Sequence, residues 1–338
     1  MKKVIAIIAG GDSSEHDVSM RSAAGIDSWI DKEKYDVYTI EVRGTDWQAH
    51  LHNGNLSPVA LHNFTFLDEW NKRVRPDYAY ITIHGTPGEN GILQGYFDLL
   101  KIPYSTSSLL VEAMTFDKFT LNQYLKGFGV KVAEDILVRK GMEVKAEDVV
   151  AKVGLPCFIK PNAGGSSFGV TKCKTAGDIL PAIEKARNES DEVLIESEMK
   201  GTEISNGVYR AKNGEVCVLP ITEVVPKTEF FDYDAKYNGQ VEEITPARLS
   251  DDTTKRVQAL TKAIYGILGA SGIIRIDYII SKNEAGDDVI NMLEINTTPG
   301  MTATSFIPQQ VRAAGLQMKD VLNDVISEKM PDEETENA

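Results

Sequence analysis

The chain has 338 residues, of which 42% are hydrophobic and 25% charged, a composition typical of a globular protein with two or three packed units. Its 50 acidic residues outnumber its 36 basic residues, so the formal net charge is −14. This charge argues against a nucleic-acid or anionic-membrane partner, because both favour a basic face, whereas a few local Lys residues are enough to bind a nucleotide.

The first part of the chain alternates strand-like and helical patterns. Strands are predicted over residues 4–9, 35–42 and 78–83, and helices over residues 15–30 and 91–100. This alternation is typical of a parallel α/β sheet, so we expect an N-terminal, Rossmann-like α/β domain over residues 1–104.

Two further units follow, with no repeat or linker between them. Residues 105–191 are expected to form a small α+β subdomain, with helices around 115–128, a helix near 176–188 and short strands at 133–138, 157–160 and 168–173. Residues 192–330 contain long strands, a polar loop at 226–246, a helix at 251–268 and a final helical region. The acidic, Pro-containing tail at 331–338 is expected to be disordered. The three units should therefore pack around a shared cleft.

Nothing in the chain indicates export or insertion into a membrane. The N-terminal apolar run is short, no small-residue cleavage site follows it, and no segment is long enough to span a bilayer. Cys157, Cys173 and Cys217 are odd in number and lie in apolar surroundings, so we expect buried free thiols. These features predict a cytoplasmic protein.

Two strand-like runs near the C-terminus carry polar side chains at spacing i, i+2. The run GIIRIDYI places Arg275 and Asp277 on one face, and NMLEIN does the same for Glu294 and Asn296. Oxygen donors without His or Cys suit Mg²⁺ better than Zn²⁺, and a guanidinium beside such a metal stabilises a transferring phosphoryl group. The alternative is a solvated ion pair on two antiparallel strands.

A Gly-rich loop follows Lys160 in the segment IKPNAGGSSFGV. The loop holds Gly165, Ser166 and Ser167, whose backbone N–H groups and hydroxyls suit a phosphate, although an ordinary Gly-rich hairpin is the alternative. It is not a Walker A sequence. It formally matches the G-x-S-x-G nucleophile elbow, but all five histidines precede Ser166, which contradicts the order of catalytic residues in α/β-hydrolases.

Two loops of the first unit also carry polar side chains. The loop GGDSSEHDVSM follows a strand and places Glu15 in the first turn of a helix, where it holds a substrate ammonium or merely complements the helix dipole. Ser14 and Asp17 have the spacing of a capping box. The loop HGTPGENGILQG follows the next buried strand, and its His84 is either a site residue or a hydrogen-bonded structural histidine.

Taken together, these ordered motifs resemble those of the D-alanine–D-alanine ligases, members of the ATP-grasp superfamily, from about Val4 to Ile326. The matching segments are GGDSSEHDVS, HGTPGENGILQG, IPYSTS with FDK, IKPNAGGSSFGV, FDYDAKY, RIDY and EINTTPGMTATS. The resemblance implies a three-domain ATP-grasp fold with an N-terminal parallel α/β domain. It also implies ATP-dependent ligation of two D-alanines through an acyl phosphate, with release of ADP and phosphate, for peptidoglycan precursor synthesis.

The resemblance further implies a role for each matching residue. Those expected to bind ATP are Lys118, Lys160, Gly165, Ser167, Glu196, Ser197, Met199 and Glu203. Two Mg²⁺ or Mn²⁺ ions would be held by Asp277, Glu294 and Asn296. The residues implied in catalysis are Glu15, Ser166, Tyr237, Arg275 and Gly300, and those implied in substrate binding are His84, Lys236, Ser305 and Phe306.

Within this scheme, Glu15 binds the ammonium of the first D-alanine, and Arg275 with the Gly300 N–H stabilises the tetrahedral intermediate. Ser166 and Tyr237 join Glu15 in closing the loop 226–246 over the site, because an acyl phosphate must be kept from water.

The nearest alternatives are a D-alanine–D-lactate or D-serine ligase and another ATP-grasp carboxylate–amine ligase; Tyr237 favours an amine acceptor. A nucleotide-binding regulatory protein without catalysis would not need Arg275 and every metal ligand. All of these residues are present here, which favours an enzyme. Asn90 and the pair Ala163-Gly164 depart from the family pattern and affect local contacts only.

The expected partners are ATP and D-alanine, without nucleic acid or membrane, and a second copy of the chain in a homodimer.

Overall fold

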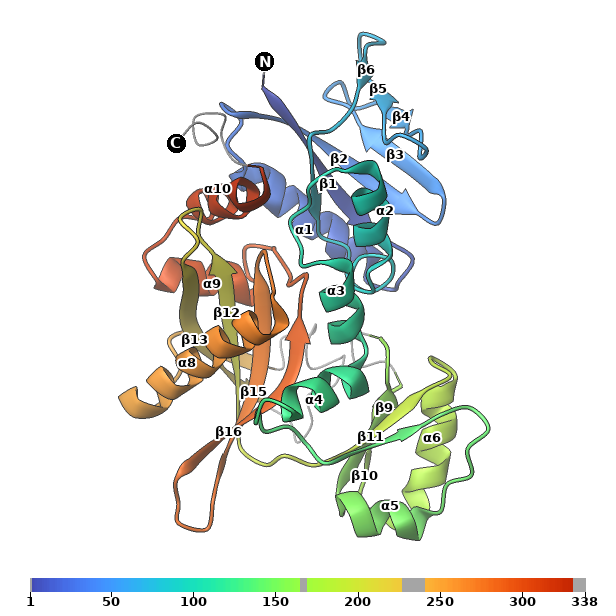
Figure 1. The fold of residues 1–338 in the computed structure, drawn as a ribbon, viewed down its shortest axis with the longest axis vertical. Helices are drawn as coiled ribbons and strands as arrows, with labels where there is room; N and C mark the ends of the chain where they lie inside the picture. The colour runs from blue at the N-terminus through green and yellow to red at the C-terminus, as the bar shows by residue number, and fades with distance from the viewer. Residues whose placement is uncertain (1, 165–168, 227–240, 331–338) are drawn as a thin grey trace.

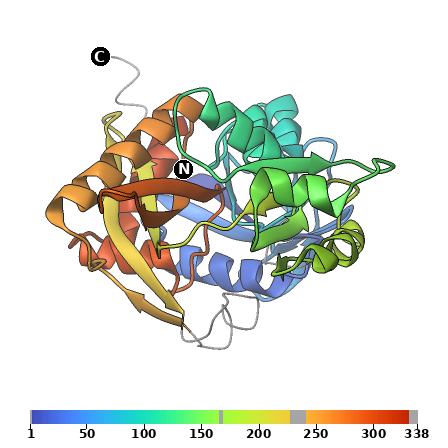
Figure 2. The same cartoon turned by 90° about the horizontal axis from the view of Figure 1, so that it is seen from below.

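The computed structural model describes residues 2–164, 169–226 and 241–330. Figure 1 shows three parts, each built on its own sheet, with the N-terminal part at the top and the other two below it. Seen from below in Figure 2, the central part (green) and the C-terminal part (orange) lie on opposite sides of the molecule. Among the described residues, none of the helices combines the length and apolar character needed to span a bilayer.

The N-terminal sheet has the strand order β4-β3-β2-β1-β7. Its strands are β1 (Lys3–Gly10), β2 (Tyr35–Arg43), β3 (Asp46–His50), β4 (Leu56–Pro58) and β7 (Tyr78–Ile81). β1 pairs in parallel with β2 and β7, which confirms the expected α/β class, whereas β3 and β4 form an antiparallel edge that was not predicted. A short hairpin joins β5 (Phe66–Leu67) to β6 (Arg73–Val74).

Helices cover both faces of this sheet. Ile5 and Ile7 of β1 pack in a cluster with α1 (His16–Trp29), whereas Ala6 and Ile8 pack in a cluster with α2 (Ile92–Leu100). Because both faces are covered, β1 reads as a continuous apolar run rather than as an alternating one. The run ends at Gly10, the last residue of β1, where the first polar loop begins.

The central sheet is antiparallel, with the order β10-β9-β11-β8. Its strands are β8 (Asp135–Val138), β9 (Cys157–Pro161), β10 (Thr171–Cys173) and β11 (Val193–Ser197), with α5 (Ala146–Val153), η1 (Ala176–Asp178) and α6 (Ile179–Arg187) packed beside them. The predicted boundary at 191/192 falls before β11. That boundary is too early for the sheet, because β11 bonds to both β8 and β9.

The helices predicted around 115–128 are present as two separate helices, and the first begins before residue 115. α3 (Leu109–Phe116) and α4 (Lys118–Lys126) are separated at Asp117, whose backbone is extended at φ −86° and ψ 98°. The Asp117 side chain accepts a bond from the Thr120 N–H at 2.8 Å and so caps α4. The break has a clear physical cause, since Asp is a strong N-cap residue, and it sets Lys118 at the first position of the new helix.

The C-terminal sheet is also antiparallel, with the order β14-β13-β12-β15-β16. Its strands are β12 (Thr202–Arg210), β13 (Val216–Pro226), β14 (Val241–Ile244), β15 (Ile274–Lys282) and β16 (Asp288–Asn296). The helices of this part are α8 (Asp251–Leu268), α9 (Phe306–Ala313) and α10 (Met318–Lys329). The expected helix at 251–268 is confirmed residue for residue.

The three cysteines are free thiols. Cys157 in β9 and Cys173 in β10 are buried opposite each other. Cys217 in β13 is partly exposed, so the expectation of burial is wrong for this residue. Its position near the β12–β13 turn, away from the middle of the sheet, accounts for the difference.

One apolar cluster joins the two ends of the chain. It contains Ile26 of α1, Tyr78 of β7, and Leu322 and Val325 of α10. The Tyr78 hydroxyl also donates to the Val325 carbonyl at 3.3 Å. The last helix therefore packs on the N-terminal part and fixes it against the C-terminal sheet.

The N-terminal part meets the C-terminal part at a second point. Ser107 Oγ donates to the Ser271 carbonyl and accepts from the Ser271 N–H, both at 3.1 Å, and Ser271 Oγ donates to the Thr106 carbonyl at 3.1 Å. The next residue, Gly272, has φ +70°, and a Cβ there would lie 1.9 Å from the Ser105 carbonyl oxygen. Only glycine permits this approach of the two backbones.

We expect Gly272→Ala to lower the thermal unfolding midpoint far more than Gly269→Ala. Gly269 also has positive φ, at +62°, but a Cβ there meets nothing within 4 Å. The control should therefore cost only the left-handed backbone penalty, about 1–2 kcal/mol, whereas Gly272→Ala adds a direct overlap. Circular dichroism on both variants measures the difference, and equal midpoints would contradict the close backbone contact.

Candidate active site

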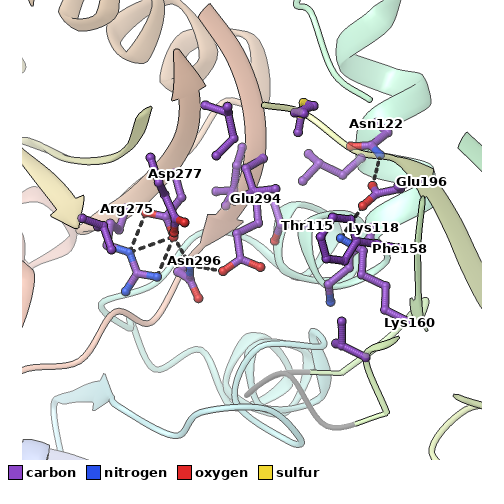
Figure 3. Close-up of a pocket in the computed structure, with 18 of the residues that line it drawn as sticks. Thr115, Lys118, Asn122, Phe158, Lys160, Glu196, Arg275, Asp277, Glu294 and Asn296 are labelled. Atoms are coloured by element: carbon purple, nitrogen blue, oxygen red, sulfur yellow. Dashed lines mark hydrogen bonds and ion pairs between the residues drawn. The ribbon is translucent and has the colours of Figure 1, made fainter. Parts of the chain in front are cut away.

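One large cavity, of about 570 Å³, is lined by residues from all three parts. The predicted site residues in its wall are Glu15, His84, Lys118, Lys160, Glu196, Ser197, Met199, Glu203, Arg275, Asp277, Glu294, Asn296 and Phe306. Figure 3 shows the polar group of β15 and β16 on one side and the lysines of α4 and β9 on the other.

The acidic side of the cavity comes from the pairing of β15 with β16. In the antiparallel register Asp277 lies opposite Glu294, and Arg275 lies opposite Asn296. The Asn296 amide nitrogen is 3.4 Å from an oxygen of Asp277 and 3.4 Å from an oxygen of Glu294. The predicted convergence of these side chains is therefore what the strand pairing produces.

Arg275 is held in place on two sides. Its Nε donates to Asp277 Oδ1 at 2.9 Å and its terminal nitrogen to Oδ2 at 2.7 Å, while the guanidinium lies 5.3 Å from the centre of the Phe306 ring. Burial alone would lower the pKa of Arg275, but the adjacent Asp277 carboxylate raises it, and the net shift is upward. A permanent, oriented positive charge therefore lines the cavity.

The oxygen donors fit a hard divalent cation. Asp277 and Glu294 supply carboxylates and Asn296 an amide oxygen, the donor types that Mg²⁺ and Mn²⁺ prefer. Ser205 Oγ donates to Asp277 Oδ1 at 2.6 Å, which orients that carboxylate as supporting residues do in metal sites. Among the described residues no group of three His, Cys, Asp or Glu side chains is placed to hold a metal. This site has only two, so substrate oxygens would have to complete the coordination.

The opposite wall carries three lysines, Lys118, Lys160 and Lys172, of which the last is paired with Glu198 at 2.5 Å. Lys118 Nζ donates to the Gly164 carbonyl at 2.6 Å, and Lys160 Nζ lies 2.5 Å from Glu196 Oε2. Burial and then the neighbouring Lys160 charge lower the pKa of the Lys118 ammonium. Two cations gathered in this way are suited to an anionic ligand with several charges.

Glu196 lies where the central sheet meets the cavity. It is buried at the end of β11, and the Asn122 amide of α4 donates to its Oε1 at 3.0 Å. Ser197 Oγ accepts from the Glu134 N–H at 3.0 Å, so β11 is fixed at this edge. Met199, in the segment leading into β12, and Glu203, the second residue of β12, line the same cavity. These residues form the wall between the central and C-terminal parts.

The two N-terminal loops approach the cavity together. Ser13 Oγ donates to the His84 carbonyl at 2.9 Å and accepts from the Glu15 N–H at 3.2 Å, so one hydroxyl links both loops. Glu15 is the N-cap residue of α1 rather than part of its first turn, and no side chain caps the helix. The predicted capping box of Ser14 and Asp17 is therefore wrong. The neighbouring Ser13 takes the bond to the loop backbone instead.

Sequence analysis missed a second carboxylate in this region. Glu89 lines the cavity, its Oε2 accepts from the Gly85 N–H at 2.7 Å, and burial raises the pKa of its carboxyl group. A signal was available, since Glu89 follows a buried strand in a Gly-rich loop as Glu15 does. Ser205 and Asn122 were also missed, because each acts through a residue distant in sequence.

Gly300 and Ser305 lie beside Phe306 rather than among the residues that line the cavity. Ser305 Oγ accepts from the Thr302 N–H at 3.1 Å, and a Cβ on Gly300 would lie 3.0 Å from that oxygen. The hydroxyl and the glycine are therefore neighbours. Five other predicted residues lie outside the described part of the chain: Gly165, Ser166, Ser167, Lys236 and Tyr237.

Comparison with known proteins agrees with this geometry. The chain matches two family models, described as D-ala D-ala ligase N-terminus over residues 4–107 and D-ala D-ala ligase C-terminus over residues 124–327. The D-alanine–D-alanine ligase of Phocaeicola vulgatus is 64% identical over 97% of this chain and 100% of its own length. That of Parabacteroides distasonis is 55% identical over 99% of this chain and 100% of its own length.

Solved structures give the same picture. The VanG D-Ala:D-Ser ligase from Enterococcus faecalis superposes with a TM-score of 0.84 at 30% identity, over 97% of this chain and all of that one. The D-alanine–D-alanine ligase from Bacillus anthracis complexed with ATP superposes with a TM-score of 0.75 at 25% identity, over 97% of each chain. The chain therefore belongs to the D-alanine–D-alanine ligase family of ATP-dependent ligases, with the ATP-grasp fold.

Proposed function

We propose that this protein joins two D-alanines into D-alanyl-D-alanine at the expense of ATP, releasing ADP and phosphate, for peptidoglycan precursor synthesis. The observation that carries the proposal is the single cavity in which Arg275 and the oxygen donors of β15 and β16 face Lys118 and Lys160. Such an arrangement suits phosphoryl transfer, which depends on positioning and on stabilising charge. Family membership supplies the substrate class.

In this proposal ATP lies between the central and C-terminal parts. Lys118 and Lys160 bind its phosphates, since they are cations of that wall that lie near each other. The residues proposed around the adenine and ribose are Glu196, Ser197, Met199 and Glu203. Gly165 and Ser167 are proposed on the phosphates but lie outside the described residues.

Asp277, Glu294 and Asn296 would hold two Mg²⁺ or Mn²⁺ ions. Bound there, the metal supplies charge that offsets the negative phosphate oxygens. The protein's own contribution is to hold these ligands on two paired strands, with Asp277 oriented by Ser205 and Arg275.

The N-terminal loops would receive the first D-alanine. Glu15 binds its ammonium, and His84 supports that contact. The carboxylate of this first D-alanine attacks the terminal phosphorus of ATP, ADP leaves, and an acyl phosphate forms. The amine of the second D-alanine then attacks the acyl carbon, and phosphate leaves. Arg275 and the Gly300 N–H stabilise the tetrahedral intermediate, because charge develops on its oxygen.

The second D-alanine would lie against Ser305 and Phe306. We propose that Ser305 binds its carboxylate, while the ring of Phe306 keeps Arg275 oriented. Lys236, Tyr237 and Ser166 remain predictions for phosphate binding and for closure of the loop, since all three lie outside the described residues. We propose a cytoplasmic location, where ATP is available.

The first test is the reaction itself. Purified protein with Mg²⁺, ATP and D-alanine should form D-alanyl-D-alanine, ADP and phosphate, which chromatography with mass spectrometry measures. AMP would contradict the acyl phosphate route, because it indicates adenylate chemistry. Adding D-serine and D-lactate tests the alternative acceptors; the 64% identity to a D-alanine–D-alanine ligase, against 30% to a D-Ala:D-Ser ligase, favours D-alanine as the acceptor.

The second test concerns the metal ligands. Glu294→Gln should lose at least the roughly 100-fold in kcat/KM that loss of a supporting residue can cost, because it removes one of two carboxylates. Asn296→Asp should lose less, since it keeps an oxygen donor. Glu284→Gln, exposed in the β15–β16 turn, is the control and should change nothing. Near-normal turnover of Glu294→Gln at ordinary Mg²⁺ would refute this placement of the metal.

We also propose a homodimer, supported by exposed apolar residues on the contacting helices α2 and α3. Leu99 is 85% exposed and Leu110 70% exposed, and such neighbouring apolar surface often marks a protein interface. Light scattering should give a dimer for the wild type and a monomer for Leu99→Glu/Leu110→Glu. Leu180→Glu, on α6 of the central part, is the matched control and should remain dimeric. A monomeric wild type would overturn the proposal.

A further inference from the structure

Asn162 connects the end of β9 to the start of α4. Its side chain is buried, and its amide nitrogen donates to Asp117 Oδ2 at 2.8 Å and to Glu192 Oε2 at 3.2 Å. Its amide oxygen accepts from the Phe119 N–H at 2.9 Å, and its backbone carbonyl accepts from the Lys118 N–H at 3.2 Å. With the bond from its own N–H to the Glu192 carbonyl at 2.9 Å, this buried residue makes five hydrogen bonds.

These contacts allow only one orientation of the amide. Two carboxylates can only accept, so the nitrogen must face Asp117 and Glu192, and a backbone N–H can only donate, so the oxygen must face Phe119. A residue of similar size that lacks either the donor or the acceptor cannot make all three of these side-chain hydrogen bonds.

Two of the contacts bind backbone N–H groups at the start of α4. The first N–H groups of a helix have no partner within it. Asp117 satisfies Thr120 at 2.8 Å, and Asn162 satisfies Lys118 and Phe119. The N-terminus of α4 is thereby fixed to the strand rather than only capped within its own chain segment.

Two lysines of the cavity wall, Lys118 and Lys160, lie on either side of this connection. Lys160 precedes Asn162 by two residues on the chain, and Lys118 is the first residue of α4. Lys118 Nζ also donates to the carbonyl of Gly164, two residues after Asn162. The position of one ammonium group relative to the other therefore depends on the Asn162 contacts.

We propose that Asn162 is a positioning residue for nucleotide binding: it holds the start of α4 against β9 so that Lys118 and Lys160 face the same polyphosphate. The inference rests on the proposed function, since it takes the ligand of the two lysines to be ATP. Two cations drawn together in a buried wall repel each other, so a fixed connection between their elements is needed before the anion arrives.

The test compares a ligand with phosphates to one without. We expect Asn162→Ala to weaken binding of AMP-PNP with Mg²⁺ about tenfold, the scale of one or two lost buried hydrogen bonds, by isothermal titration calorimetry. Binding of adenosine, followed by ligand-observed NMR, should change less than twofold, because adenosine has no phosphate. A purely structural role predicts a lower unfolding temperature with both affinities unchanged, and that result would overturn the proposal.

A swap of donor and acceptor keeps the proposal falsifiable if Asn162→Ala folds poorly. Asn162→Asp sets a carboxylate against Asp117, and Asp117→Asn sets two amide nitrogens against each other, so each single variant should bind AMP-PNP weakly. The double variant restores a donor facing an acceptor, and Asn still caps α4, but it leaves two carboxylates facing each other at positions 162 and 192, where the wild-type contact is 3.2 Å. Adding Glu192→Gln supplies a donor there too. The triple variant should recover most of the affinity; a triple variant no better than either single one would contradict the proposal.

Arg139→Ala is the matched control. Arg139 Nε donates to Glu192 Oε1 at 2.9 Å, on the same carboxylate but at the exposed side. Its loss should leave AMP-PNP binding unchanged; an equal loss of affinity would assign the effect to Glu192 instead.

The wild type separates the two proposals. If it forms ADP with D-alanine while the Asn162 variants bind normally, only this inference fails, and if it does not bind AMP-PNP, the proposed function fails with it.

Discussion

The antiparallel pairing of β15 with β16 is the constraint on which the rest of the structure depends. It sets Asp277 opposite Glu294, and Arg275 binds Asp277 at 2.7 Å, so two carboxylates and a guanidinium gather in one largely buried wall. Charged groups taken out of water are stable only when groups of opposite charge lie near them. The lysines of the facing wall supply further positive charge, and a divalent metal bound by these ligands would add more.

The fold brings the remaining groups to this pair from three separate sheets. The N-terminal loops contribute Glu15 and Glu89, and the central part contributes Lys118 and Lys160. The cluster joining α1, β7 and α10, together with the close approach at Gly272, fixes the N-terminal part against the C-terminal sheet. The central part is connected to the cavity by hydrogen bonds at Asn122 and Asn162, so its contribution depends more on polar contacts.

Much of this arrangement could be predicted from the sequence where a short pattern determines geometry. Spacing i, i+2 on an apolar strand placed Arg275 and Asp277 on one face, and the alternation of strand-like and helical segments predicted the α/β class of the first part. The predictions failed where distant partners decide the outcome. β11 joins the central sheet through pairing with β8 and β9, and Glu89 becomes a site residue only once three parts meet.

In the proposed reaction, this cavity activates the carboxylate of D-alanine by phosphoryl transfer. The metal ligands of β15 and β16 would act at the phosphates of ATP, and Glu15 would bind the amino acid. The most direct measurement supplies D-alanine labelled with ¹⁸O in its carboxylate, with ATP and Mg²⁺, and analyses the released phosphate by mass spectrometry. The account predicts one ¹⁸O atom in each phosphate, because the carboxylate oxygen that attacks ATP leaves with phosphorus. Unlabelled phosphate, formed while the dipeptide accumulates, would contradict it.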